Sequence, residues 1–358
     1  MNAAATAISR TAEALGARVL RCEQISAGRT DVYRVSLASP SNDTPRGEPG
    51  NQLPAGLSLA AARIAPADAS ATGSVTDQRD GHRVVHALAR HGGQVATPLH
   101  PDPVTTSEGQ VAFWEWLTPA SPLSAAGWGR LTAHLHTRGT DTARALSDVS
   151  IGTYDPLRAF GPRLHLAYAH AGRRGHPLHG RQELLRTFET ALEAATERAR
   201  AAAADSAGVL VHGDNQPANV LRTPTETVVL ADFERLAWGP AALDWSGLLL
   251  GRWHYGFTAH HARDFHHGYR TLAQVPDPEA ALAQAEPFAR VRELSGVLVA
   301  MLAADDSARW EREMYARLPT ITDPGFGDRW TFIGSPTDMH LTDMCPSGGK
   351  PERKDVPT

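Results

Sequence analysis

The sequence predicts an α+β protein of two lobes, a small lobe built on an antiparallel β-sheet and a larger lobe that is mainly helical. Strand-like stretches separated by turns of small residues dominate up to residue 117. Beyond that point apolar residues recur mostly at helical spacing, and 358 residues suffice for two lobes with a core each. We therefore expect a small lobe over residues 1–117, a helical lobe over 118–334 and a disordered tail over 335–358.

The small lobe is predicted to begin with a β-hairpin. Residues 19–25 and 31–37 have strand character, and the small-residue segment 26–30 joins them. Residues 40–56 are rich in Pro, Ser, Gly, Asn and Asp, which indicates a surface loop. A third strand, a helix closed by Gly92-Gly93 and a last strand follow, over residues 57–64, 84–89 and 111–117. We expect a sheet of about five strands with one helix.

Composition and charge narrow the classes of function. The net charge of −4 provides no basic field for a polyanion, so nucleic acid is not expected as a partner. No run of about 18 apolar residues occurs, so no membrane-spanning helix is expected. The two cysteines, Cys22 and Cys345, lie at opposite ends and the first twenty residues lack signal-peptide character, which together favour a cytoplasmic protein. Oligomeric state is not indicated.

The absence of lysine from most of the chain excludes two kinds of site. The only lysines are Lys350 and Lys354. Apart from histidine, every basic residue before Lys350 is arginine. A Walker-type phosphate loop ends in Gly-Lys-Ser/Thr, and Schiff-base chemistry needs a lysine amine. The sequence therefore excludes both from residues 1–349.

The most informative stretch runs from residue 209 to residue 234. It reads as strand, polar loop, strand, turn, strand and acidic end, with a hairpin that would place Asn219 beside Asp232. Asp214 precedes Asn219 by five positions in the polar loop, so three oxygen-bearing side chains can converge. Carboxylate and carbonyl oxygens suit magnesium, which usually shares its remaining sites with water and nucleotide phosphates.

The same stretch resembles a known family. His212-Gly213-Asp214 with Asn219 is similar to the H-G-D-x-x-x-x-N catalytic loop of the aminoglycoside phosphotransferase and choline kinase families, which are relatives of the protein kinases. Asp232-Phe233-Glu234 resembles the D-F-G element of kinases. The resemblance implies a protein-kinase-like fold that transfers the γ-phosphoryl group of ATP or GTP to a hydroxyl of an antibiotic such as an aminoglycoside, or of a hydroxylated metabolite. Asp214 would be the catalytic base, and Asn219 and Asp232 would bind Mg²⁺.

Other segments extend the resemblance from about residue 25 to residue 250. The segment 239–245 is similar to a family segment in which Asp244 would support the catalytic loop through backbone N–H groups. His212 is expected to support the loop by hydrogen bonding rather than to act as acid or base. Residues 114–117 look like the hinge that binds adenine, with Glu115 and Leu117 as nucleotide contacts. Gly28 would belong to the nucleotide-positioning loop of the small lobe, and the acceptor cleft would lie in the helical lobe.

Arg63 is the main departure from the family pattern. It occupies the third-strand position where a lysine usually binds the α- and β-phosphates, and a guanidinium can bind phosphate in a bidentate manner. The carboxylate partner of this cation is expected to be Asp80 or, second, Asp77.

Two alternatives remain open. A pseudokinase would bind a nucleotide or metabolite without turnover. The missing lysine favours that reading, and the complete set of Asp214, Asn219 and Asp232 argues against it. A metal-dependent hydrolase could use Asp, Asn and His around His212. Histidines also crowd residues 165–179 and 254–267, but zinc needs tightly arranged ligands, and the second range is more simply a solvated helix.

Overall fold

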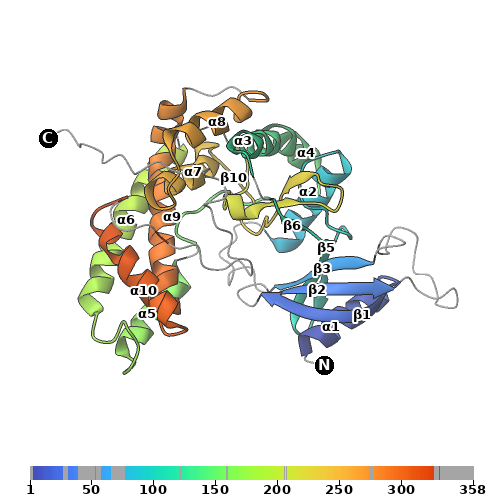
Figure 1. The fold of residues 1–358 in the computed structure, drawn as a ribbon, viewed down its shortest axis with the longest axis horizontal. Coiled ribbons are helices and arrows are strands. Elements are labelled where there is room, and N and C mark those ends of the chain that lie inside the picture. The colour runs from blue at the N-terminus through green and yellow to red at the C-terminus, as the bar shows by residue number, and fades with distance from the viewer. Residues whose placement is uncertain are drawn as a thin grey trace.

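The computed structural model describes residues 3–26, 31–38, 53, 58–65, 77–120, 123–158, 160–204, 206, 208–273, 277–325 and 330. It has two lobes, a small one built on a sheet and a larger one built mainly of helices (Figure 1). The predicted α+β class is therefore confirmed. The expected tail over residues 335–358 and the loop tip with Gly28 lie outside the described residues.

The small lobe contains a five-stranded antiparallel sheet in the order β1-β2-β3-β5-β4, which confirms the predicted sheet. Alternate residues of β2, among them Tyr33 and Val35, point into the core, as period-two patterning requires. The strands are β1 (Arg18–Ser26), β2 (Asp31–Ala38), β3 (Leu59–Ala65), β4 (Val104–Thr106) and β5 (Gly109–Glu115).

The described part of the small lobe has two helices where the sequence predicted one. Helix α1 (Ala3–Ala14) packs beside β1 and β5 and buries Ile8 and Ala12 in the sheet's core. Its run of alanines favours a helix by propensity but marks an apolar face only weakly, which is why the pattern missed it. Helix α2 (Gln78–Arg90) is the predicted one, and it begins at its N-cap residue Asp77.

Helix α2 connects the two lobes. Its apolar side chains Val84, Val85 and Leu88 belong to a hydrophobic cluster that is built mainly from the larger lobe. The segment after it also bonds to that lobe, because Ala96 N donates to Leu230 O (2.6 Å) and Leu230 N donates to Gln94 O (3.0 Å). The hairpin of the predicted site is thereby attached directly to the small lobe.

Two short sheets of the larger lobe hold the predicted site. Strand β6 (Thr118–Pro119) pairs with β8 (Val220–Arg222), and β8 pairs with β9 (Val228–Leu230). Strand β7 (Val209–Val211) pairs with β10 (Ala237–Gly239), a strand that the sequence analysis did not predict. The predicted hairpin between residues 220 and 231 is confirmed, with Val220 opposite Leu230.

Helices make up the rest of the larger lobe. Helix α9 (Pro278–Ala303) packs against α6, α7 and α10 and buries Leu294 and Met301. The remaining helices are α3 (Ala125–His134), α4 (Thr140–Ala145), α5 (Gly161–Gly172), α6 (Gln182–Ala204), α7 (Ala242–His254), α8 (Ala259–Tyr269) and α10 (Ala308–Arg317). A π-helical turn, η2 (Leu135–Gly139), joins α3 to α4, and short 3₁₀ turns occur at η3 (Pro217–Asn219) and η4 (Leu318–Ile321).

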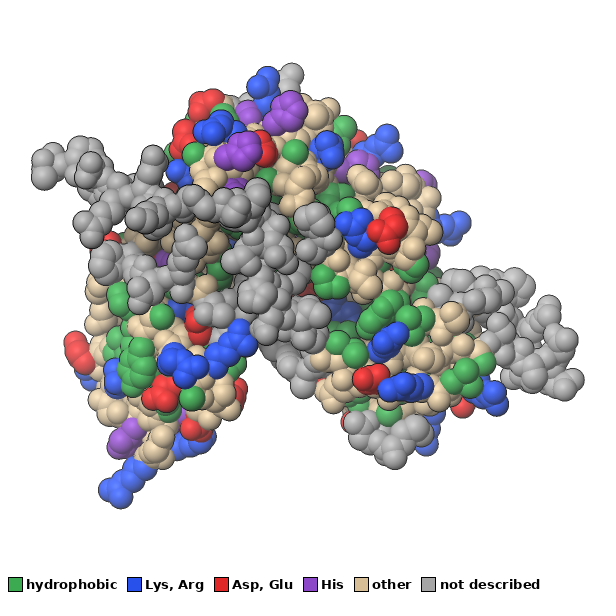
Figure 2. Space-filling view, in the orientation of Figure 1, with side chains coloured by type: hydrophobic (Ala, Val, Ile, Leu, Met, Phe, Trp, Pro, Cys, Tyr) green, Lys and Arg blue, Asp and Glu red, His purple; other side chains and the backbone are tan. Residues whose placement is uncertain are grey.

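Charged groups are interspersed on the surface. On the face shown in Figure 2, acidic and basic side chains of the described residues are scattered over both lobes. No described helix is both long enough and apolar enough to cross a bilayer.

Candidate active site

The polar loop that follows β7 makes a sharp turn at Gly213. This residue has φ +76°, a left-handed conformation that favours glycine. A Cβ atom there would lie 2.3 Å from the main-chain oxygen of Arg235, so no other side chain fits without movement of the backbone. The turn directs the next residue, Asp214, toward a cavity of the larger lobe.

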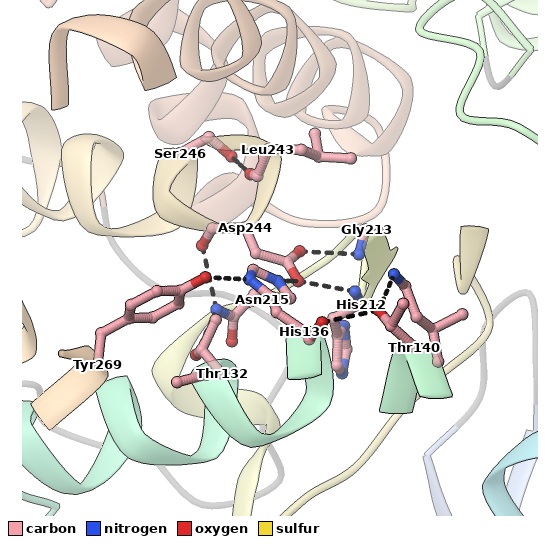
Figure 3. A network of polar contacts seen from close by, with 12 residues as sticks. Thr132, His136, Thr140, His212, Gly213, Asn215, Leu243, Asp244, Ser246 and Tyr269 are labelled. Carbon is pink, nitrogen blue, oxygen red and sulfur yellow. Dashed lines mark hydrogen bonds and ion pairs between the residues drawn. The ribbon is translucent and has the colours of Figure 1, made fainter. Parts of the chain in front are cut away.

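A fully buried carboxylate, Asp244 on α7, holds the main chain of this loop. Its Oδ2 accepts from His212 N (2.7 Å), and its Oδ1 accepts from Gly213 N (2.9 Å). His136 Nε2 donates to Oδ2 (2.9 Å), and the other ring nitrogen of His136 bonds to the hydroxyl of Tyr269 (2.6 Å), as Figure 3 shows. Burial by itself would raise the pKa of Asp244, but these N–H donors and the histidines outweigh it and lower the pKa. The contact expected for Asp244 is present.

His212 is also used structurally. Its ring is buried, its Nε2 donates to Ala231 O (2.7 Å) and its Nδ1 accepts from Asp214 N (3.3 Å). Because both ring nitrogens bond to the backbone, neither remains for acid–base chemistry. A supporting role, as expected from the sequence, stays a prediction to which these two bonds correspond.

Asn215 is a third anchor of the loop, and its importance was missed. It is fully buried, its Oδ1 accepts from Trp128 Nε1 (2.7 Å), and its Nδ2 donates to Thr132 Oγ1 (2.9 Å) and Asp244 O (3.0 Å). Figure 3 shows this amide beside the Asp244 network. The position of Asn215 in the polar loop does not by itself reveal these partners, which lie on other elements.

The hairpin brings the candidate magnesium ligands together. Asn219 O accepts from Ala231 N (2.8 Å), which places Asn219 beside Asp232 as expected. Asn219 Nδ2 donates to Asp214 O (2.8 Å), an arrangement that directs Oδ1 of the amide away from that bond and makes it available to a cation. Asp232 has φ +68°, unusual for a residue with a side chain, and strain of this kind often occurs at functional sites.

Arg63 has different partners from those expected. Its Nη2 donates to Asp232 Oδ1 (2.8 Å) and to Glu234 Oε1 (2.5 Å), so the predicted pairing with Asp80 or Asp77 is wrong. Asp77 instead accepts from Arg79 N as the helix cap, and Asp80 accepts from Ser150 N (3.0 Å). Burial would lower the pKa of Arg63, but the two carboxylates more than offset it and raise the pKa.

Arg292 on α9 was not predicted as a site residue. Its Nη2 donates to Asp214 Oδ1 (2.6 Å), while its Nη1 donates to Asn215 O and Ser246 Oγ, both at 3.2 Å. Its side chain is only 10% exposed, so the pair is largely shielded from water. Helical periodicity alone does not show which residue of this helix faces the loop. Both candidate carboxylates, Asp214 and Asp232, thus have an arginine partner.

The main-chain groups of the predicted hinge differ in whether they already form a hydrogen bond. Glu115 N donates to Thr97 O (2.9 Å), so this N–H is not available to a base, whereas Leu117 makes no hydrogen bond within the described part of the chain.

No group of three or more His, Cys, Asp or Glu among the described residues is arranged to hold a metal. One carboxylate and one amide oxygen, from Asp232 and Asn219, fit magnesium only if phosphates or water complete its shell.

Comparisons with known proteins identify the family and the fold. The sequence pattern of a family described as "Phosphotransferase enzyme family" matches residues 62–288, whereas no curated protein matches the sequence. The microcompartment-associated aminopropanol kinase aligns with 16% identity and a TM-score of 0.57, over 88% of this chain and 95% of its own. Choline kinase LicA from Streptococcus pneumoniae gives 12% and 0.55, over 89% and 99%. The GDP complex of aminoglycoside 2'-phosphotransferase-IIIa gives 13% and 0.51, over 91% and 100%. At these identities the likeness shows the fold, which is protein-kinase-like, as predicted.

Proposed function

The chain belongs to the phosphotransferase enzyme family, and we propose that it transfers the γ-phosphoryl group of ATP or GTP to a hydroxyl group of a small molecule in the presence of Mg²⁺. The observation that carries the proposal is the convergence of Asp214, Asn219 and Asp232 through the Asn219 bond to the loop and the β8–β9 hairpin. The acceptor is a hydroxylated antibiotic, such as an aminoglycoside, or a hydroxylated metabolite.

In this proposal each residue of the site has a role that follows from its position. Asp214 accepts the hydrogen bond of the acceptor hydroxyl and directs it in line with the phosphoryl group, while Arg292 holds one oxygen of that carboxylate in place. Asn219 and Asp232 would hold Mg²⁺, which neutralises charge on the phosphates when bound. Because the transition state is loose, orientation and electrostatics supply most of the rate.

Nucleotide binding is proposed for the region between the lobes. Leu117 would offer its free main-chain groups to the base, and Glu115 and Gly28 remain predicted contacts. Arg63 would bind the phosphates, and since it pairs with Asp232 and Glu234 in this structure, phosphate and Mg²⁺ would take over part of those pairings. We also propose a cytoplasmic location, on the ground of the two distant cysteines.

The test is a titration of the full chain with ATP and GTP, with and without Mg²⁺, coupled to a nucleotide-consumption screen over antibiotics and hydroxylated metabolites. Magnesium-dependent binding with acceptor-stimulated consumption supports the proposal. Binding without consumption by any acceptor favours a pseudokinase. Absence of nucleotide binding rejects the proposal and favours the hydrolase alternative.

A further inference from the structure

A cavity of about 360 Å³ opens beside Asp214 in the larger lobe. A volume of this size accommodates a small organic molecule. Its walls come from the loop after β7, the turn after Phe233, helices α7, α9 and α10, and the single described residue Trp330. If Asp214 orients the acceptor hydroxyl, as the proposed function states, this cavity holds the rest of the acceptor.

The charges lining the cavity are mainly positive. The described residues of its wall include three arginines, Arg235, Arg292 and Arg317, and a single carboxylate, that of Asp214. Two of the arginines are neutralised locally. Arg292 pairs with Asp214 (2.6 Å), and Arg317 donates to Glu313 Oε2 from Nε (3.1 Å) and Nη2 (3.0 Å).

No described side chain compensates the charge of Arg235. Its half-buried side chain makes no ion pair and no hydrogen bond with the residues that the structure describes. A guanidinium in such a place attracts an anionic group, which it can bind through two parallel N–H bonds. An acceptor with several positive charges would meet repulsion from Arg235 and find no carboxylate on the described wall except the one already paired to Arg292.

The remainder of the wall is largely apolar and aromatic. Tyr255, Phe257, Trp310 and Trp330 line it, and Val299 of α9 adds an aliphatic side chain that is 36% exposed. Apolar lining with a few polar groups is typical of a site for a molecule that has an apolar body and one or two polar handles.

From this combination we infer that the acceptor is a hydroxylated molecule with an apolar or aromatic body and an anionic oxygen group, a carboxylate or a phosphate, bound by Arg235. This inference rests on the proposed function for the identity of the cavity as the acceptor site. It assigns Arg235 to substrate selection. Of the two acceptor classes in the proposed function, it favours a hydroxylated metabolite, or an antibiotic that carries an anionic group, over a polycationic aminoglycoside.

The experiment compares four small molecules that share a benzene ring with a hydroxymethyl group and differ in the charge of their second substituent. The probes are 3-(hydroxymethyl)benzoate, 3-(hydroxymethyl)phenyl phosphate, the neutral 3-(hydroxymethyl)benzamide and the cationic 3-(hydroxymethyl)benzylamine. Their binding to the full chain is measured by calorimetry without nucleotide, and nucleotide consumption is measured separately. We expect an anionic probe to bind about tenfold or more tightly than the amine, since a charge-assisted bond is worth at least about one power of ten.

Three variants test the assignment. Arg235→Gln should remove the tenfold preference for the anion and leave nucleotide affinity unchanged, while Arg174→Gln, an exposed arginine away from the cavity, should alter neither. Val299→Glu places a carboxylate on the exposed part of the wall and should shift the preference toward the amine. Comparing the affinities of the benzoate and the phenyl phosphate shows whether the site prefers a carboxylate or a phosphate.

Several results would overturn the inference. These are equal or tighter binding of the amine, no saturable binding of either anion at millimolar concentration, and loss of nucleotide affinity rather than anion affinity in Arg235→Gln. The last result would show that Arg235 binds the nucleotide rather than the acceptor. Anion binding that depends on Arg235 without any nucleotide consumption would support the charge selectivity of the cavity and reject the proposed phosphotransfer.

Discussion

Replacing Asp244 by asparagine exchanges one carboxylate oxygen for an NH₂ group at a fully buried position. In the native chain the two oxygens accept from three N–H groups, those of His212 N, Gly213 N and His136 Nε2. An amide has a single acceptor oxygen, so its NH₂ group must face at least one of these donors. The change therefore leaves a buried N–H without an acceptor and removes the negative charge from the remaining bonds.

The expected loss follows from these contacts. A buried donor left without a partner costs about 1–3 kcal/mol, and hydrogen bonds to a charged group are worth about 1.5–3 kcal/mol each. Loss of one partner of a buried ionic contact usually totals about 3–5 kcal/mol, which we take as the expected decrease in the free energy of unfolding. Because the loop that carries Asp214 also loses its support, phosphotransfer should decrease further than nucleotide binding.

Urea unfolding monitored by circular dichroism measures this decrease, provided that the transition slope is unchanged. Asp264→Asn is the matched control, since its carboxylate is exposed and bonds only to His260 on the same helix (3.2 Å) among the ion pairs of the described residues. The control should lose less than about 1 kcal/mol. A decrease below about 1 kcal/mol for Asp244→Asn would refute the view that this carboxylate organises the loop.

The other predictions concern the base, the metal ligand, the buried amide and pH. Asp214→Ala should reduce transfer by several orders of magnitude with little change in nucleotide affinity, and an equal loss of nucleotide binding, measured by calorimetry, would contradict the assignment of Asp214 as base. Asp232→Ala should abolish the magnesium dependence of nucleotide binding, whereas normal MgATP binding in that variant would place the metal elsewhere. Asn215→Leu should lower the free energy of unfolding by about 1–3 kcal/mol in urea, because it leaves Trp128 Nε1 without its acceptor; unchanged stability would show that the loop repacks. Since the pKa of Asp244 is lowered by folding, its stabilisation is complete above the unfolded pKa of about 3.9 and disappears as the pH falls through the folded value. The stability difference between the wild type and Asp244→Asn should therefore shrink toward low pH, and a constant difference down to acid pH would exclude this linkage.

Much of the candidate site could be predicted because it is local in sequence. Asp214, Asn219 and Asp232 lie within one loop and one hairpin, and a hairpin's geometry brings its two open ends together whatever surrounds it. The five-stranded sheet and the helical lobe could likewise be predicted, since residue periodicity reports which face of an element is buried.

Long-range contacts decided the rest. Arg63 bonds to residues about 170 positions away rather than to the expected acidic residues near α2, and the length of an arginine side chain allows that choice only after the lobes are packed. Arg292 and Asn215 acquired their contacts in the same way, from the packing of α9 and α3 against the loop. The sequence by itself determined which groups are present and which lie on one hairpin. Only the tertiary structure decided which charge neutralises which, because charge compensation depends on distances that sequence spacing does not set. It also left Arg235 without a partner at the cavity among the residues that the structure describes.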